Sequence, residues 1–337
     1  RIWESAGIAR RSSLNGVEAW TEKGFYRICA NCNHVERHDD KEGFAAQCPQ
    51  CGASPTSQKM PFIIPFGFLT AYSDRNGRDP GATRLRVRPV DEARLLTQAA
   101  DTDFHASDLN GVDSFFAPAV PRGGEKAGQM FIANRGPAGK GYLRCPKCEF
   151  ALPTPRDFAF GKEIQKKHSN PRTGDVCPVD KLGWPTDLAH IFETDLRAIR
   201  FSFPLPQFDG GTERENRAAR EGFIRTLSEA LRLAATDLLG TDPRDVRSTA
   251  EIPTGSAVVI LSDATPGGAG YCRRLLNPEE PRFSARALIG KAAQILDCDR
   301  GEACESSCSH CLNDFSNQQY WDKLNRHPVL EWLMSLL

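Results

Sequence analysis

The stretch "LDCDRGEACESSCSHCLNDFSNQQYWDKL" (residues 296–324) concentrates four cysteines in a short segment near the carboxyl-terminal end of the sequence. They are Cys298, Cys304, Cys308 and Cys311. Cysteines this close together are poorly placed for two unstrained disulfides, whereas four thiolates in a compact loop suit one zinc ion. His310 could replace one of them, but four cysteines make a histidine unnecessary. We therefore expect the fold to end in a zinc site.

The composition is that of an ordinary globular protein, with 337 residues, 40% hydrophobic and 26% charged. This length allows two or three domains. A formal net charge of zero counts against a strong free-standing nucleic-acid binder, although it leaves room for a local basic face. We find no secretory signal and no apolar run that could span a membrane, so no membrane partner is expected. Because the sequence begins with Arg1 rather than Met, we expect a fragment or a processed product.

The twelve cysteines also indicate where the protein works. Disulfide frameworks are typical of short secreted chains, whereas this long chain has no signal and places several cysteines in C-x-x-C pairs. Zinc in a reducing cytoplasm is the better interpretation, with about three Zn²⁺ ions.

Two C-x-x-C pairs near the amino-terminal end predict a zinc ribbon. "CANC" and "CPQC" contribute Cys29, Cys32, Cys48 and Cys51. Each tight turn directs two thiolates at one point, and two such turns complete a tetrahedron. A thioredoxin-like redox role is the weaker alternative, because no βαβ pattern surrounds either pair.

A second zinc module begins at "KGYLRCPKC", which resembles "KGFYRICANC" of the first ribbon. Cys145 and Cys148 supply one pair, and Cys177 with His168 would complete a Cys₃His set. His190 competes for the histidine position. It sits among apolar residues in "DLAHIF", where a histidine of the core is commoner than a ligand.

The glycine turn "TPGGAG" (residues 265–270) follows an apolar run and precedes a helix. The free N–H groups around Gly267, Gly268 and Gly270 could bind an anion, but no nucleotide motif is present. The alternative is a tight turn that needs positive φ angles. Asp263 is a polar site residue or an N-cap, and Cys272 is a small buried residue unless an activating partner makes it catalytic.

Arginines alternate with apolar residues in "RLRVRPV". A strand would place Arg84, Arg86 and Arg88 on one face, which could meet DNA phosphates. The alternative is a solvated sheet surface.

The predicted fold class is α+β or α/β, with zinc-ribbon β-modules followed by an α/β domain. We assign a zinc ribbon to residues 1–60, a β-rich region to 61–144, a second zinc module to 145–194, and the α/β domain with the terminal cluster to 195–337. In this last domain, a capping box at Thr212 and Glu215 predicts a helix that Gly240 ends. "AVVIL" (257–261) predicts a buried strand, and helices should follow at about 284–296 and near the carboxyl-terminal end.

The segment "SDATPGGAGYCRRL", followed by a helix and "CDRGEACESSCSHCL", resembles the zinc-binding domain of MrfA-type superfamily 2 helicases. The same domain occurs in DrmB, a helicase-associated protein of DISARM anti-phage systems. "NDFSNQQYWDKLNR" (313–326) and "AHIFETDLRAIRF" (189–201) are similar to the DrmB branch. The resemblance covers roughly residues 145–337, and the looser spacing from Cys298 to Cys308 departs from the family's tighter cluster.

This resemblance implies a zinc-binding, non-catalytic module that scaffolds a helicase and helps to bind DNA in an anti-phage defence complex. The sequence contains no Walker A lysine and no DEAD-type box, so the motor would be a DrmA-like partner subunit or covalently linked helicase domains. One alternative is the carboxyl-terminal portion of a single large MrfA-like or Druantia-like helicase. Two others are a standalone nuclease-like enzyme that uses Asp263 and a purely structural protein-interaction module.

Overall fold

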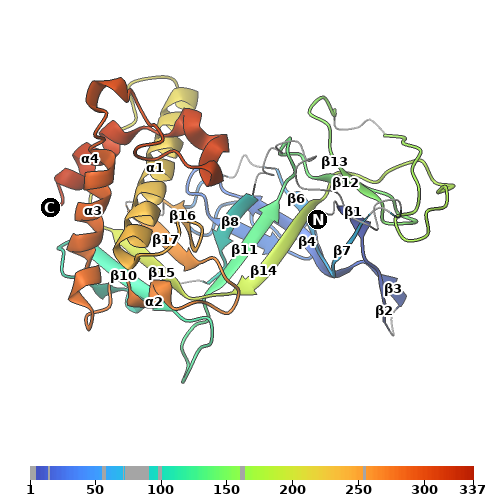
Figure 1. The fold of residues 1–337 in the computed structure, drawn as a ribbon, viewed down its shortest axis with the longest axis horizontal. Helices are drawn as coiled ribbons and strands as arrows, with labels where there is room; N and C mark the ends of the chain where they lie inside the picture. Colours follow the sequence, from blue (N-terminus) through green and yellow to red (C-terminus); the bar gives the residue numbers. More distant parts are fainter. Residues whose placement is uncertain are drawn as a thin grey trace.

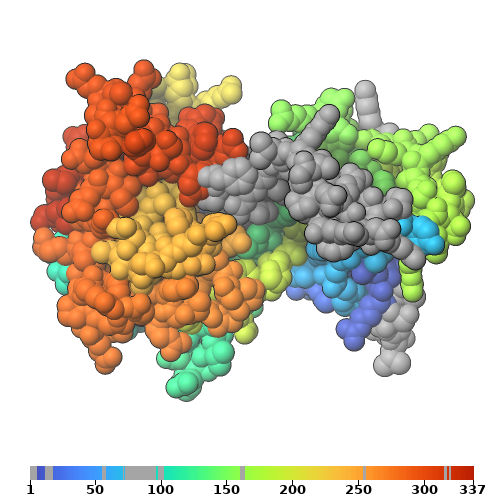
Figure 2. Space-filling view, in the orientation of Figure 1, coloured from blue at the N-terminus to red at the C-terminus, as the bar shows by residue number. Residues whose placement is uncertain are grey.

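The structure is a computed structural model that describes residues 5–13, 16–54, 58–70, 72, 91–97, 101–159, 164–252 and 256–337. The chain forms two halves, each built on its own β-sheet (Figure 1). Figure 2 shows the halves as two bulges, with the carboxyl-terminal helices on one of them.

A five-stranded sheet lies in the carboxyl-terminal half, in the order β16-β17-β15-β10-β9. Its strands are β9 (His105–Ala106), β10 (Val112–Ala117), β15 (Leu196–Phe201), β16 (Val246–Glu251) and β17 (Ala257–Asp263). All its pairings are antiparallel, so α+β is the description that fits this domain. The predicted apolar strand is β17, which pairs on both sides and is buried along almost its whole length.

Three helices cover one face of this sheet (Figure 1). They are α1 (Glu213–Leu239), α3 (Ala285–Leu296) and α4 (Arg326–Met334). The capping box of Thr212 and Glu215 begins α1, and Gly240 in the left-handed region ends it, as predicted. Shorter elements are α2 (Tyr271–Arg274) and the 3₁₀ helices η3 (Asp101–Asp103), η4 (Pro281–Phe283), η5 (Gly301–Ala303) and η6 (Phe315–Lys323). Within the described residues, no helix has the length and apolar character needed to cross a membrane.

The other half contains a six-stranded sheet in the order β5-β4-β6-β14-β11-β8. Its strands are β4 (Trp20–Ile28), β5 (Val35–His38), β6 (Met60–Pro65), β8 (Asp91–Leu95), β11 (Gln129–Asn134) and β14 (Asp187–Glu193). The β6–β14 pairing is parallel and the others are antiparallel. Rings of Tyr26, Phe62 and Phe131 contact one another in its core. Three small ribbons complete this half: β1 (Ser5–Ile8) with β7 (Phe68–Thr70), β2 (Arg11–Ser13) with β3 (Gly16–Glu18), and β12 (Tyr142–Arg144) with β13 (Ala151–Pro153).

The chain passes between the two sheets more than once. β10 and β15 belong to the five-stranded sheet, whereas β11 and β14, which lie between them in sequence, belong to the six-stranded sheet. The first cysteine turn also contacts the other half, since the Ile252 N–H donates to the Cys32 carbonyl at 2.9 Å. Both sheets take strands from more than one of the segments that the sequence suggested as domains. The domain boundaries proposed from the sequence stay a prediction.

Candidate zinc centres

Three groups of four side chains come together in the fold, and within each group the potential ligand atoms all lie within 4.8 Å of one another. The groups are Cys29, Cys32, Cys48, Cys51; Cys145, Cys148, His168, Cys177; and Cys298, Cys304, Cys308, Cys311. A tetrahedral zinc ion with Zn–S bonds near 2.3 Å requires sulfurs about 3.8 Å apart. The printed Sγ–Sγ distances run from 3.6 to 3.9 Å. Each group could therefore hold one zinc ion, and none of the cysteines forms a disulfide.

The first centre is built from two turns with the same backbone geometry. The Cys29 N–H donates to the carbonyl of His34, and the Cys29 carbonyl accepts from the N–H of Asn33. Cys48 makes the same two bonds at the same spacing, with Ala53 and Gly52. Asn33 and Gly52 adopt positive φ angles of 62° and 68° to close the turns. The pairs then meet, with Cys29 3.7 Å from Cys51 between their sulfurs. The local spacing of C-x-x-C thus suffices to orient two sulfurs, as the sequence predicted.

Burial and local hydrogen bonds shift the pKa values of two thiols of this centre, Cys32 and Cys51, in opposite directions. Burial raises the pKa of Cys32 well above its ordinary value. At Cys51 burial acts in the same direction, but hydrogen bonds from the Asn31 side chain and the Ala53 backbone outweigh it and hold the pKa at about 7.

The second centre repeats the turn at Cys145, where Glu149 takes the positive φ of 60°. His168 Nε2 lies 3.2 Å from Cys148 Sγ. The other ring nitrogen, Nδ1, lies 2.8 Å from the Lys166 carbonyl, and the ring stacks on Phe150 with centroids 4.5 Å apart. A backbone partner on Nδ1 fixes the tautomer that leaves Nε2 free as a ligand.

The structure separates the two candidate histidines. His168 is buried with the three cysteines. His190 is exposed on β14, opposite Ile132 of β11, and stacks on Phe192 with ring centroids 5.1 Å apart. His190 is not among the side chains that meet at the second centre, so His168 is the histidine of this group.

The third centre occupies the loop after α3. Its sulfur pairs Cys298–Cys308 and Cys304–Cys311 are 3.6 and 3.8 Å apart. At Cys308 burial is outweighed by hydrogen bonds, first from the His310 backbone, and the pKa falls to about 7. The imidazole of His310 itself is exposed, with Nδ1 3.3 Å from an Asp299 carboxylate oxygen, so it lies outside the group.

Arg326 holds this loop from inside, a role that sequence reasoning missed. Its side chain is only 6% exposed. The guanidinium donates to the carbonyls of Leu296, Gly301 and Cys304 at 3.1, 3.0 and 3.3 Å. Arg326 is the first residue of α4, where a positive charge interacts unfavourably with the helix dipole, so the dipole does not explain why an arginine stands here. The hydrogen bonds to these three carbonyls explain it.

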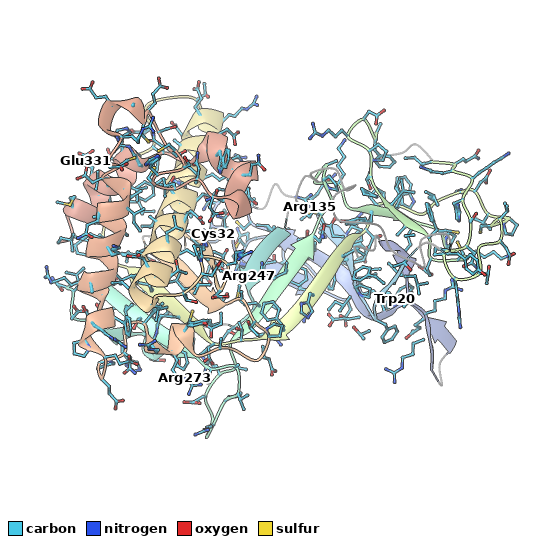
Figure 3. The ribbon with its side chains drawn as sticks, viewed as in Figure 1. Trp20, Cys32, Arg135, Arg247, Arg273 and Glu331 are labelled. Atoms are coloured by element: carbon cyan, nitrogen blue, oxygen red, sulfur yellow. The ribbon has the colours of Figure 1, made fainter. Side chains whose placement is uncertain are left out.

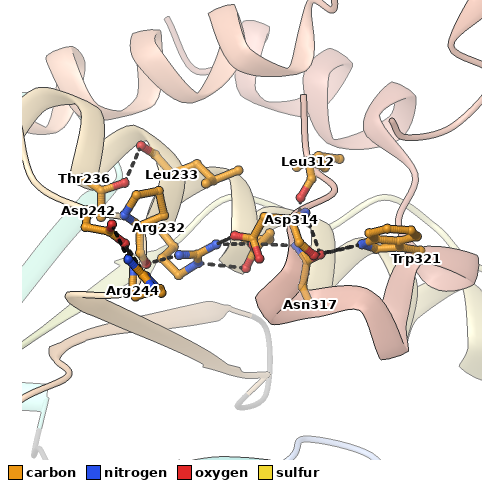
Figure 4. A network of polar contacts seen from close by, with 11 residues as sticks. Arg232, Leu233, Thr236, Asp242, Arg244, Leu312, Asp314, Asn317 and Trp321 are labelled. Atoms are coloured by element: carbon orange, nitrogen blue, oxygen red, sulfur yellow. Dashed lines mark hydrogen bonds and ion pairs between the residues drawn. The ribbon is translucent and has the colours of Figure 1, made fainter. Parts of the chain in front are cut away.

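A polar network anchors the segment that follows the cluster to α1 (Figure 4). Arg232 of α1 pairs with Glu229 and with Asp314. Asn317 donates to the Glu229 carboxylate and to the Leu312 carbonyl, each at 2.7 Å. Its own amide oxygen accepts from Trp321 Nε1 at 2.7 Å. Asp314, Asn317 and Trp321 of the "NDFSNQQYW" segment therefore have a structural role, which is to attach this segment to α1.

The glycine turn has the positive φ angles that its sequence suggested, 86°, 75° and 83° at Gly267, Gly268 and Gly270. Most of its N–H groups already have partners inside the protein. Gly267 donates to the Glu193 carbonyl at 2.7 Å and Gly268 to the Thr265 carbonyl at 3.0 Å. The geometry therefore favours the tight-turn alternative, and anion binding here stays a prediction.

Asp263 fills the turn with its own carboxylate. The side chain is fully buried and accepts from the N–H groups of Ala269, Tyr271 and Cys272 at 2.6, 3.1 and 2.9 Å. The N-cap position of α2 is Gly270, but Asp263 accepts from the first N–H groups of this helix and so acts as a cap from outside it. These bonds occupy the carboxylate and disfavour a nuclease-like role. Burial, and then the charge of Asp263, raises the pKa of Cys272, which makes it an inert thiol rather than a nucleophile.

Arg84, Arg86 and Arg88 lie outside the described residues, so their predicted role in DNA binding stays a prediction.

Comparison with known proteins supports part of the resemblance. Residues 227–312 match the MrfA Zn-binding domain. This range contains Asp263, the glycine turn and all four cysteines of the third centre. Over 147 residues the chain is 31% identical to the Druantia protein DruE of Escherichia coli (strain UMEA 4076-1). That match covers 41% of this chain and 8% of DruE, so the chain spans less than a tenth of the length of this relative.

A solved structure, the DUF1998 helicase MrfA bound to DNA, aligns with 75% of this chain and 26% of its own, at 16% identity and a TM-score of 0.35. The alignment is too loose to carry an argument about arrangement. The expected resemblance is confirmed for the MrfA Zn-binding domain, which residues 227–312 match, whereas the narrower assignment to DrmB stays a prediction.

Proposed function

We propose that this chain is a zinc-binding, non-catalytic module of a helicase-associated machine for anti-phage defence. The observation that carries the proposal is the coincidence of the third cysteine centre with the match to the MrfA Zn-binding domain. DruE supports the link to defence systems.

In this proposal the three groups of side chains each bind one structural zinc ion. All three sets offer four protein ligands, which is typical of structural sites, whereas catalytic sites keep a position open. The ions hold loops that would otherwise have little core of their own. Since unpaired thiolates survive best in a reducing compartment, we assign the protein to the cytoplasm.

The identity of the motor is the finer part of the proposal. The DruE match favours the alternative in which the chain is part of a large Druantia-like helicase. The assignment to DrmB, with a separate DrmA-like subunit in a DISARM complex, rests on the sequence resemblance alone. In either case the chain would scaffold the motor and contribute to its contact with DNA.

The test is affinity purification of the natural protein from its host, followed by intact mass spectrometry and ATPase assays. We expect a DNA-stimulated ATPase either in the same polypeptide, which supports the Druantia-like alternative, or in a second subunit, which supports DrmB. Recovery of the protein without any such motor would overturn the proposal.

The link to defence has its own test in the same host. Deleting the gene should raise the plating efficiency of at least one phage, and a Cys308→Ser allele should behave like the deletion if the protein needs its third centre. An exposed substitution, Arg244→Gln, is the matched control, since its side chain is 82% exposed. Equal plating for deletion and wild type across a broad phage panel would refute the defence role.

A further inference from the structure

Two cavities adjoin the amino-terminal zinc modules, and the second of them reaches α1. The first has a volume of about 670 Å³ and the second about 660 Å³. Both are lined by Gln58, Met60 and Arg135, so they meet around these side chains. Figure 3 shows Arg135 just beyond the end of β11, between the two halves of the molecule. We call the joined cavities the basic groove.

Positive charge is concentrated in this groove. Among the residues that the structure describes, its lining includes eight lysines and arginines but only three acidic residues, Asp187, Glu213 and Glu221. The whole chain has a formal net charge of zero, so the excess is local. A cleft lined by one sign of charge focuses its field on a ligand of the opposite sign.

The acidic residues of the groove are already engaged. Asp187 accepts from Tyr26 at 2.6 Å and pairs with Arg135 at 3.5 Å. Glu213 pairs with Arg217, and Glu221 with Arg225. They leave other cations of the lining without a carboxylate partner.

Three of those cations bind only neutral groups. Lys59 Nζ donates to the Lys41 carbonyl at 2.7 Å, and Lys140 Nζ to the carbonyls of Arg156 and Phe158 at 2.6 and 3.0 Å. Arg220 donates to the Asn31 amide oxygen at 3.3 Å. Among the described residues, no carboxylate lies within ion-pair distance of Lys59, Lys140 or Arg220. Their charges are available to an anionic ligand that runs along the groove.

An exposed aromatic ring stands in the same lining. Trp184 is 59% exposed, so its ring is accessible to a ligand. Met60, Pro61 and Pro185 line the cavity with it. Apolar surface of this kind suits the faces of unpaired bases, which a duplex hides, while the cations suit a phosphate backbone.

We propose that the basic groove binds single-stranded DNA, with phosphates on Lys59, Lys140 and Arg220 and a base stacked on Trp184. The choice of a nucleic acid rests on the proposed function as well as on the charge. Apart from Ile252, the residues that line the groove lie outside residues 227–312, so the groove adds a DNA contact that the MrfA Zn-binding domain match does not assign.

The experiment measures binding of the zinc-loaded chain to fluorescent oligothymidylate of about 20 nucleotides, by anisotropy, across about 50 to 200 mM salt. Trp184→Ala should weaken binding roughly 5- to 150-fold, the range found for the loss of one stacked base. Phe68→Ala is the matched control, because Phe68 is 56% exposed and lies outside the groove. It should leave the affinity unchanged.

The charges have a separate readout. Lys59→Gln with Lys140→Gln keeps hydrogen-bond donors for the local carbonyls but removes two charges, so the slope of log affinity against log salt should flatten by about 1.4. Arg122→Gln with Arg282→Gln removes two exposed charges elsewhere and should leave the slope as it is.

Several results would overturn the inference. One is an absence of oligothymidylate binding by the wild type, and another is an equal loss of affinity in Trp184→Ala and Phe68→Ala. A third is that the wild type binds duplex DNA or oligouridylate as tightly as oligothymidylate. A fourth is that polyglutamate competes as effectively as DNA, which would indicate an acidic protein as the occupant. Zinc content and circular dichroism of every variant verify folding. The proposed function is tested by the motor and by phage plating, so the groove can fail while that proposal stands.

Discussion

Replacing Arg326 by methionine should loosen the third centre without touching a cysteine. Methionine keeps an unbranched apolar stem but removes every donor. The carbonyls of Leu296 and Cys304 would then be buried without the guanidinium, while that of Gly301 can turn to water because this residue is exposed. Each buried carbonyl left unsatisfied costs about 1 to 3 kcal/mol, so for two of them we expect a loss of about 2 to 6 kcal/mol.

The assay has two parts, because a chain with several metal centres need not unfold in one step. Urea denaturation followed by circular dichroism reports the stability of the helical half, and transfer of zinc to a coloured chelator reports opening of the loop. Arg326→Met should lower the denaturation midpoint and release one zinc ion faster, with Arg326→Lys in between. Arg282→Met, at a side chain 70% exposed, is the control. A change below about 1 kcal/mol, with unchanged zinc release, would show that the guanidinium does not hold the loop.

Three further predictions concern the metal sites and the glycine turn. Cys148→Ser should reduce the bound zinc by one ion per chain in native mass spectrometry, and an unchanged count would exclude the second centre. Asp263→Asn should destabilise the protein by about 2 to 3 kcal/mol in urea, since charge-assisted bonds to three N–H groups are weakened; loss of a nuclease activity at unchanged stability would contradict this structural role. Because burial raises its pKa, Cys272 stays a protonated, inaccessible thiol at pH 8, so iodoacetamide should modify it only after unfolding, and rapid labelling of the native protein would refute this.

Features set by local sequence were predictable. The capping box at Thr212, the stop at Gly240 and the paired sulfurs of each C-x-x-C turn depend on residues within a few positions of one another. The same holds for the four cysteines of the third centre, which one loop contains. The choice between His168 and His190 was not decidable in this way. It depends on which histidine the tertiary structure brings to the three cysteines, and the sequence spacing does not fix that.

Long-range contacts account for what the sequence did not reveal. In the sequence nothing distinguishes Arg326 from other charged residues next to an apolar helix. Only the tertiary structure brings the carbonyls of the zinc loop around its guanidinium. The basic groove takes Lys59, Lys140 and Arg220 from three separate segments, none of them a basic run. Conversely, the segment from Asp263 to Gly270 looked like a binding site, but the Asp263 carboxylate and the N–H groups of Gly267 and Gly268 already have partners inside the protein.

The central claim, that three separate four-ligand zinc centres hold this chain together, is tested most directly by native mass spectrometry of protein purified without added metal. The account predicts a single dominant species with three zinc ions and all twelve cysteines free of disulfides. A folded protein that carries no zinc, or whose mass shows the loss of hydrogens expected for disulfides among the eleven clustered cysteines, would contradict it.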